Sequence, residues 1–103
     1  MTRIEFTHHA KDDREERILR IATTIGFGET VRAFPRHNQY GDTLHCITDT
    51  GVIIIKDRSE TKVITMFVCS KRQLLNYYGN RKPPKSLYNA VVRNEKRKFL
   101  FEI

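Results

Sequence analysis

The chain has 103 residues, which suffices for one folded domain with a modest core and excludes two. Its 39 % hydrophobic and 30 % charged residues are typical of a globular domain, and no apolar run approaches the roughly 20 residues that cross a bilayer. Residues 1–10 also lack the apolar segment of a secretory signal, so we expect a cytoplasmic protein without a membrane partner.

The net charge of +7 lies entirely in the last third of the chain. Residues 1–70 contain ten Lys/Arg and ten Asp/Glu, whereas residues 71–103 contain nine Lys/Arg and two Glu. Such a basic block favours a polyanionic partner, because neutralising phosphates releases their counterions. The alternative interpretation is a solvated basic surface that keeps a small protein in solution.

The chain begins with an expected short strand or extended lead-in over Arg3–Thr7, followed by a helix over residues 8–25. Apolar residues recur there at i, i+3, i+4 and i+7, which places them on one helical face: Ile18, Ile21, Ala22 and Ile25. Gly26 supplies a stop. Residues 26–42 are rich in glycine and interrupted by Pro35, so we expect a loop with at most a short helix over Glu29–Phe34.

From Thr43 the hydrophobic period changes to two, which predicts strands at 43–49, 51–57 and 62–70. Short polar turns join them, so the three strands form an antiparallel meander. The middle strand contains four consecutive apolar residues, Val52, Ile53, Ile54 and Ile55, which indicates that both faces of the sheet are covered.

The third strand is expected to place Val63, Thr65, Phe67 and Cys69 on one face. Cys46 and Cys69 would lie on the first and third strands, too far apart for a disulfide. We therefore expect two buried, reduced thiols.

Two further helices are expected after the sheet. Ser70 can cap a helix over Lys71–Tyr78 that ends at Gly79, and a second helix covers Ser86–Arg97. Residues 98–103 either extend that helix or form an edge strand. The predicted fold is a single α+β domain of residues 1–103, with an N-terminal helix on a three- to four-stranded antiparallel meander sheet and C-terminal helices.

His9 is a candidate for proton transfer, because histidine titrates near neutral pH without perturbation. Metal-independent RNA cleavage needs a base that takes the 2′-hydroxyl proton and an acid that protonates the leaving oxygen. A surface or partly packed histidine is the alternative. No histidine or cysteine pair has the spacing of a zinc site, and His45 and Cys46 would point to opposite sides of a strand. We expect no metal and no cofactor.

The polar stretch KDRSE lies between the second and third strands, and its composition is explained by turn formation alone. Thr65 beyond it has a hydroxyl among apolar neighbours, which either touches a phosphate in a cleft or simply packs its methyl group. The basic block and its tyrosines form a candidate RNA-binding set, in which rings stack bases and cations hold phosphates: Lys71, Arg72, Tyr77, Arg81, Lys82, Lys85, Arg93, Lys96 and Arg97. Alternatively, the tyrosine rings belong to the core.

Two stretches, FTHHAKDDREER and TGVIIIKDRSETKVITMFV, resemble the small ribonuclease toxins of the RelE-like and barnase-like superfamily over residues 4–70. The resemblance implies helices before a twisted antiparallel sheet, RNA on the exposed face of that sheet and cleavage without metal. It also implies an acidic antitoxin or immunity protein as partner. Carried over residue by residue, the resemblance assigns catalysis to His9, Arg14, Arg17 and Thr65. The ribonuclease hypothesis below adds Arg58 as a further cation.

Three hypotheses remain from the sequence. The first is a toxin-like endoribonuclease in which His9 is the general base or acid, the arginines stabilise the phosphorane and Thr65 positions the phosphate. The second is a non-catalytic nucleic-acid-binding module that uses the basic segment 71–98. The third is a structural domain that contacts other proteins.

Overall fold

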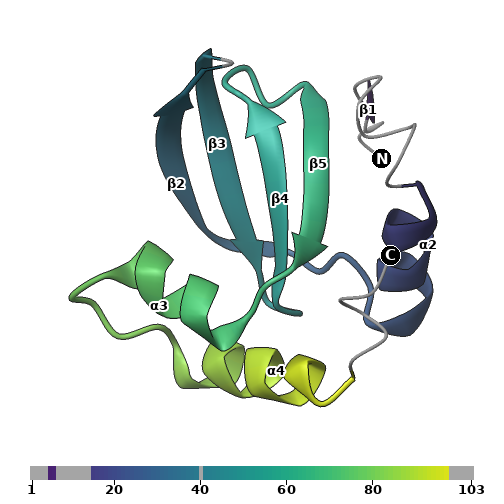
Figure 1. The fold of residues 1–103 in the computed structure, drawn as a ribbon, viewed down its shortest axis with the longest axis vertical. Helices are drawn as coiled ribbons and strands as arrows, with labels where there is room; N and C mark the ends of the chain where they lie inside the picture. Colours follow the sequence, from purple (N-terminus) through teal and green to yellow (C-terminus); the bar gives the residue numbers. More distant parts are fainter. Residues whose placement is uncertain (1–4, 7–14, 40, 98–103) are drawn as a thin grey trace.

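The computed structural model describes residues 5–6, 15–39 and 41–97, which form a five-stranded sheet with helices on both faces (Figure 1). The elements in chain order are β1 (Glu5–Phe6), α2 (Glu15–Thr24), β2 (Thr30–Asn38), β3 (Gly41–Thr48), β4 (Val52–Asp57), β5 (Lys62–Val68), α3 (Lys71–Tyr78) and α4 (Lys85–Glu95). The strand order is β1-β5-β4-β3-β2. The pairs β2–β3, β3–β4 and β4–β5 are antiparallel, whereas β1 pairs in parallel with β5. The predicted α+β fold is confirmed.

The meander of β3, β4 and β5 has the expected register. Cys46 pairs with Ile54, which pairs with Met66, and all three are buried. Ile53 is also fully buried and faces the opposite side, so the apolar run of β4 is covered on both faces as predicted. The strands of this sheet are therefore fixed by burial on two sides.

The expected loop with a short helix over Glu29–Phe34 is wrong, because Thr30–Asn38 forms strand β2 at the edge of the sheet. Most side chains of this strand are at least partly exposed, and Phe34 is buried. An edge strand needs no apolar alternation, and it accepts Pro35 because its outer side carries no partner strand. The glycines and the proline thus predicted a loop, but this segment is an extended edge strand.

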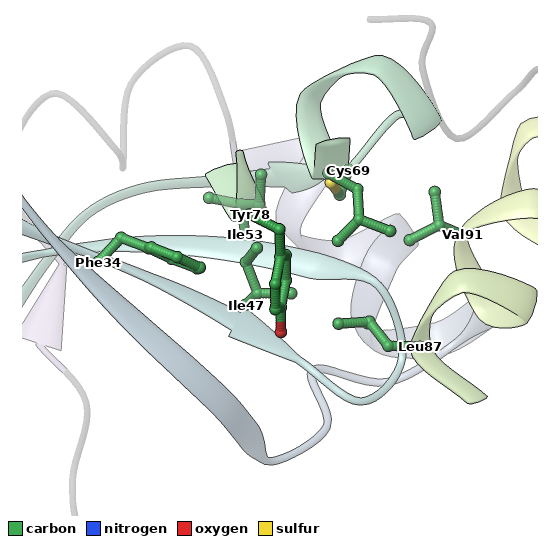
Figure 2. Close-up of a cluster of buried hydrophobic side chains, with 8 residues drawn as sticks. Phe34, Ile47, Ile53, Cys69, Tyr78, Leu87 and Val91 are labelled. Atoms are coloured by element: carbon green, nitrogen blue, oxygen red, sulfur yellow. The ribbon is translucent and has the colours of Figure 1, made fainter. Parts of the chain in front are cut away.

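Two hydrophobic clusters lie on opposite faces of the sheet. On the first face, which we call the α2 face, Ile21 packs with strand residues, and Ile18 and Ile25 adjoin it. The second, the α3 face, is covered by the two C-terminal helices. Its buried residues, most of them shown in Figure 2, are Phe34, Ile47, Ile53, Cys69, Leu74, Tyr78, Leu87 and Val91.

The expected common face of Val63, Thr65, Phe67 and Cys69 is corrected at its first member. Val63 belongs to the α2-face cluster, whereas Phe67 and Cys69 belong to the α3 face. The register of β4 with β5 shifts between Ile55 and Lys56, since Ile55 pairs with Thr65 but Lys56 pairs with Val63. This irregularity reverses the side-chain phase within one strand.

The helices around the sheet agree with the sequence where the structure describes them. Ser70 and Gln73 form a capping box at the start of α3, and Gly79 follows its end. Residues 8–14 of the expected first helix, and residues 98–103, lie outside the described part of the chain. Within the described ranges, no helix is sufficiently long and apolar to span a membrane.

Candidate nucleic-acid interface

Two arginines of β2 lie against aromatic rings on the α3 face. The guanidinium carbon of Arg32 is 5.3 Å from the centroid of Phe34 and 5.6 Å from that of Tyr78. That of Arg36 is 5.7 Å from Phe34 and 5.3 Å from Tyr77. Neither guanidinium forms an ion pair with a carboxylate of the described residues. Both positive charges are therefore held in place by rings and remain available to an anion.

Tyr77 also contacts a histidine of the neighbouring strand. Its hydroxyl lies 2.5 Å from Nδ1 of His45, and the two rings are 5.6 Å apart. Burial is the main cause that lowers the pKa of His45 below its usual value of 6.5, and the nearby charge of Arg36 adds to it. Burial likewise raises the pKa of Tyr77. At neutral pH, this pair therefore consists of a neutral imidazole and a neutral phenol.

Two polar atoms of the α3 face lack a partner. His45, Ile55 and Thr65 lie in one row across three strands. His45 Nε2 and Thr65 Oγ1 are both buried without a hydrogen bond to any described residue. Unsatisfied buried polar atoms are rare in native proteins, so two of them in one row distinguish this part of the sheet from ordinary core.

Part of the α3 face has no helix over it. Figure 1 shows α3 and α4 at one end of the sheet, and no described helix covers the half of this face nearest the β2–β3 and β4–β5 turns. Between β2 and α3 lies a cavity of about 300 Å³ lined by Arg36, Gln73, Asn76 and Tyr77. One cationic and one aromatic side chain thus line a recess between β2 and α3.

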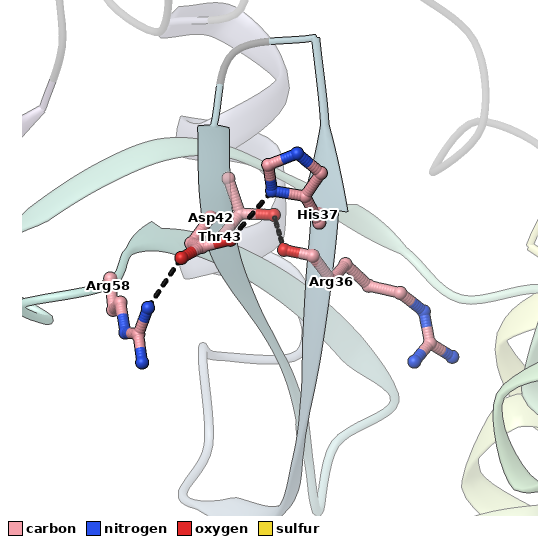
Figure 3. A network of polar contacts seen from close by, with 5 residues as sticks. All are labelled: Arg36, His37, Asp42, Thr43 and Arg58. Atoms are coloured by element: carbon pink, nitrogen blue, oxygen red, sulfur yellow. Dashed lines mark hydrogen bonds and ion pairs between the residues drawn. The ribbon is translucent and has the colours of Figure 1, made fainter.

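A second polar group lies at the β2–β3 hairpin. Asp42 accepts a hydrogen bond from Arg58 at 2.5 Å and lies 2.7 Å from Nδ1 of His37 (Figure 3). These two partners, His37 first, lower the pKa of Asp42. The Arg36 side chain extends away from this group in the same view. Because Asp42 pairs with Arg58, this arginine is not a free cation for the α3 face.

The basic residues of the last third are placed on the surface of the two C-terminal helices and their connection. All eight that the structure describes are exposed: Lys71, Arg72, Arg81, Lys82, Lys85, Arg93, Lys96 and Arg97. Arg93 and Arg97 line one cavity of about 210 Å³ beside Asp49 and Thr50, away from Tyr77. The block is therefore a broad basic surface and does not form one compact cluster.

The structure describes two of the four catalytic candidates from the sequence, Arg17 and Thr65. His9 and Arg14 lie outside the described residues. Arg17 belongs to α2, whose apolar residues pack on the α2 face, whereas Thr65 pairs in a row with His45 of the α3 face. Arg17 thus lies on the helix that covers the α2 face, whereas Thr65 lies in a row of the α3 face.

Among the described residues, no group of three metal-ligating side chains comes together. Cys46 and Cys69 are free and buried, as expected. Burial, with Glu95 as a smaller cause, raises the pKa of the Cys69 thiol to about 12, so this sulfur is a core group and not a nucleophile.

The sequence did not single out Arg32, Arg36 or His45 as an RNA contact. Arg32 and Arg36 stand two positions either side of Phe34, and that alternation was the available signal for a strand with one cationic–aromatic face. His45 and Tyr77 are 32 positions apart and share no motif. No known protein family, curated protein or solved structure matches this chain.

Proposed function

We propose that this protein binds single-stranded RNA along strand β2 on the α3 face. The observation that carries the proposal is the pair Arg32 and Arg36, each held against aromatic rings without a described carboxylate partner. Proteins that bind single strands combine cations for the phosphates with planar side chains on which bases stack. The β2 edge offers both in one row.

The exposed cations of α3 and α4 support the same proposal. Residues 71–97 carry eight Lys/Arg and one glutamate, so an RNA strand that leaves the sheet meets further positive charge. Each phosphate contact releases counterions, and the affinity for RNA then falls steeply with added salt. By the resemblance to toxin-type ribonucleases, an acidic antitoxin or immunity protein is the expected protein partner, and this basic surface complements its charge.

Cleavage of the bound RNA without a metal is the second candidate function. It is favoured by the partnerless atoms of His45 and Thr65, which lie buried on the α3 face. In such a reaction a base removes the 2′-hydroxyl proton, and the 2′ oxygen attacks the adjacent phosphorus. A cyclic phosphate forms while an acid protonates the departing 5′ oxygen. Because both atoms are buried, access to them requires that the surface above them opens.

Binding is tested by fluorescence anisotropy with a labelled single-stranded RNA at several salt concentrations. We expect the double variant Arg32→Gln/Arg36→Gln to weaken binding and reduce the salt slope by about 1.4, because two phosphate contacts are lost and each contributes about 0.7 for a single strand. Charge reversal at Arg93, Lys96 and Arg97 is expected to weaken binding as well. Arg58→Gln removes an exposed arginine that pairs with Asp42, and it serves as the matched control. Equal losses in the control and the double variant would contradict the proposed surface.

Cleavage is tested on a denaturing gel with mixed tRNA and mRNA in EDTA. Wild type is compared with His9→Ala and with His45→Ala. Fragments that disappear only with His9→Ala place the chemistry at the amino-terminal segment, whereas fragments that disappear only with His45→Ala place it on the sheet. Intact RNA with wild-type protein, together with salt-dependent binding, identifies a non-catalytic RNA-binding module.

A further inference from the structure

The recess between β2 and α3 is lined by hydrogen-bond donors, and none of its described lining residues carries a carboxylate. It measures about 300 Å³, and its lining residues are Arg36, Gln73, Asn76 and Tyr77. The last three are spaced i, i+3 and i+4 on α3, so their side chains share one helical face. Arg36 approaches them from β2. The recess therefore offers one positive charge and two amides to a ligand.

The guanidinium of Arg36 is held in place at this recess and keeps donors for a ligand. Its carbon lies 5.3 Å from the centroid of Tyr77, and its Nη1 donates to the carbonyl oxygen of Pro35 at 3.1 Å. A guanidinium has five N–H donors, so one hydrogen bond leaves most of them for an anion. The hydroxyl of Tyr77 is already in contact with His45. Tyr77 thus supports the cation and does not compete for the ligand.

The two amides add uncharged donors beside this cation. Gln73 Oε1 accepts the backbone N–H of Ser70 at 2.9 Å, so the NH₂ group is the part of this side chain that is left for a ligand. Asn76 is exposed and has no hydrogen bond with a described residue, so its amide can turn its NH₂ group to the same ligand. A phosphate group only accepts hydrogen bonds and accepts them on several sides. It therefore satisfies all three donors without a fixed orientation.

We propose that Arg36, Gln73 and Asn76 bind one backbone phosphate group of the RNA strand in this recess. This inference rests on the proposed RNA binding, and it adds the group that enters the recess and two uncharged residues that hold it. Arg36 supplies the charge, and the two amides donate to the phosphate oxygens. Phosphate contacts position a strand without reading its bases, so the recess binds a strand irrespective of its sequence.

Charged and uncharged contacts to a phosphate differ in their dependence on salt. A cation that contacts a phosphate of a single strand releases counterions, so its loss reduces the salt slope by about 0.7. A neutral amide releases none, and loss of its hydrogen bond lowers the affinity by the same factor at every salt concentration. A salt series therefore separates the contribution of Asn76 from that of Arg36.

The test measures the anisotropy of a labelled uridine octamer at salt concentrations between about 0.05 and 0.2 M. We expect Asn76→Ala to weaken binding about two- to tenfold, the range for one hydrogen bond, and to leave the salt slope unchanged. Arg36→Gln should weaken binding and reduce the slope by about 0.7. Asn89→Ala removes an exposed amide from α4 outside the recess, and this matched control should bind as wild type does.

A second octamer, made of abasic residues, tests which part of the strand enters the recess. It carries the same phosphates as the uridine octamer and no bases. We expect Asn76→Ala to weaken the binding of both octamers by the same factor. Gln73→Glu keeps the acceptor for Ser70 and loses the donor. It should weaken both octamers more than Asn89→Asp, which adds the same charge on α4.

The outcomes separate this inference from the proposed function. Failure of the wild-type protein to bind the uridine octamer overturns both. Wild-type affinity in Asn76→Ala overturns the phosphate site and leaves the RNA surface along β2 standing. A loss confined to the uridine octamer, or an abasic octamer that does not bind, assigns the recess to a base and also overturns the inference. An equal loss for both octamers with an unchanged salt slope supports it.

Discussion

The hydroxyl of Tyr77 lies 2.5 Å from Nδ1 of His45, which joins α3 to the central part of the sheet. The two residues are 32 positions apart in the sequence. Tyr77 also lies against the guanidinium of Arg36, and His45 belongs to the row with Ile55 and Thr65. Helix α3 is thereby joined to strand β3 by a polar contact. This position makes the pair suitable for several tests.

We expect Tyr77→Phe to lower the free energy of unfolding by about 1–3 kcal/mol, because it leaves a partly buried imidazole nitrogen without a partner. Urea unfolding measures the change. Tyr88→Phe is the matched control, since the Tyr88 hydroxyl has no hydrogen bond with a described residue, and it should stay within about 0.5 kcal/mol of wild type. Equal effects of the two substitutions would show that the hydroxyl contact contributes little.

Stability should fall as the pH decreases from about 7.5 to 5.5. The pKa of His45 is below 6.5 in the folded state, so the unfolded chain binds the proton first when the pH drops below that value. The contribution of His45 is therefore complete above pH 6.5 and decreases as the pH falls toward the folded-state pKa. Urea midpoints at the two pH values measure the fall.

His45→Gln removes this titration and should make the stability less dependent on pH over the same interval. His37→Gln changes an exposed histidine that pairs with Asp42, and it retains His45. The stability of this variant should therefore fall with decreasing pH as that of wild type does. If wild type and His45→Gln lose stability in parallel, another group causes the pH dependence.

Neither cysteine should react with a thiol reagent in the folded protein. Cys46 and Cys69 are buried, and burial raises the pKa of both thiols, that of Cys69 to about 12. We expect no colour with 5,5′-dithiobis(2-nitrobenzoate) at pH 8 under native conditions and two equivalents in about 6 M guanidinium chloride, a usual denaturing concentration. A rapid native reaction would mean that one sulfur becomes accessible by local opening.

Gly51→Ala should destabilise the protein more than Gly41→Ala. Both glycines have positive φ, +85° and +100°, so both substitutions strain the backbone. At Gly51 a new Cβ would also lie 2.8 Å from Nδ2 of Asn94, whereas at Gly41 it meets open space. Asn94 is buried and donates to the carbonyl of Thr50, so α4 has little room to withdraw.

We expect the free energies of unfolding of these two variants to differ by about 1–3 kcal/mol, which is the usual cost of overpacking a core. Thermal unfolding of both proteins beside wild type measures it. Similar melting temperatures for the two variants would mean that α4 moves aside without cost.

The parts of the fold that burial determines could be predicted from sequence. The meander, the capped helix from Lys71 and the buried thiols all depend on local periods or on single residue types, and these predictions are confirmed. Strand β2 could not be predicted in this way, because an edge strand is exposed and its proline and flanking glycines are typical of a loop. Val63 was assigned to the wrong face of the sheet, because the register irregularity in β5 cannot be seen in the alternation of apolar and polar residues.

The candidate site was less accessible to sequence reasoning. Tyr77 was predicted as an RNA contact from its basic surroundings, and the structure adds Arg36 and His45 as its neighbours. Those neighbours come from strands 32 or more positions away, and only the pairing of the strands brings them to α3. The expected role of His9 stays a prediction, as that residue lies outside the described part of the chain.

The parallel pairing of β1 with β5 has a consequence for the order in which the fold is completed. Glu5 pairs with Lys62 and Phe6 with Val63, so the first strand meets a partner 57 positions later. On a ribosome that adds about 5–20 residues per second, β1 would wait about 3 to 11 s before its partner exists. The antiparallel strands between them close through short turns and can pair as they emerge. The earliest part of the sheet to be made is therefore the last to be joined to it.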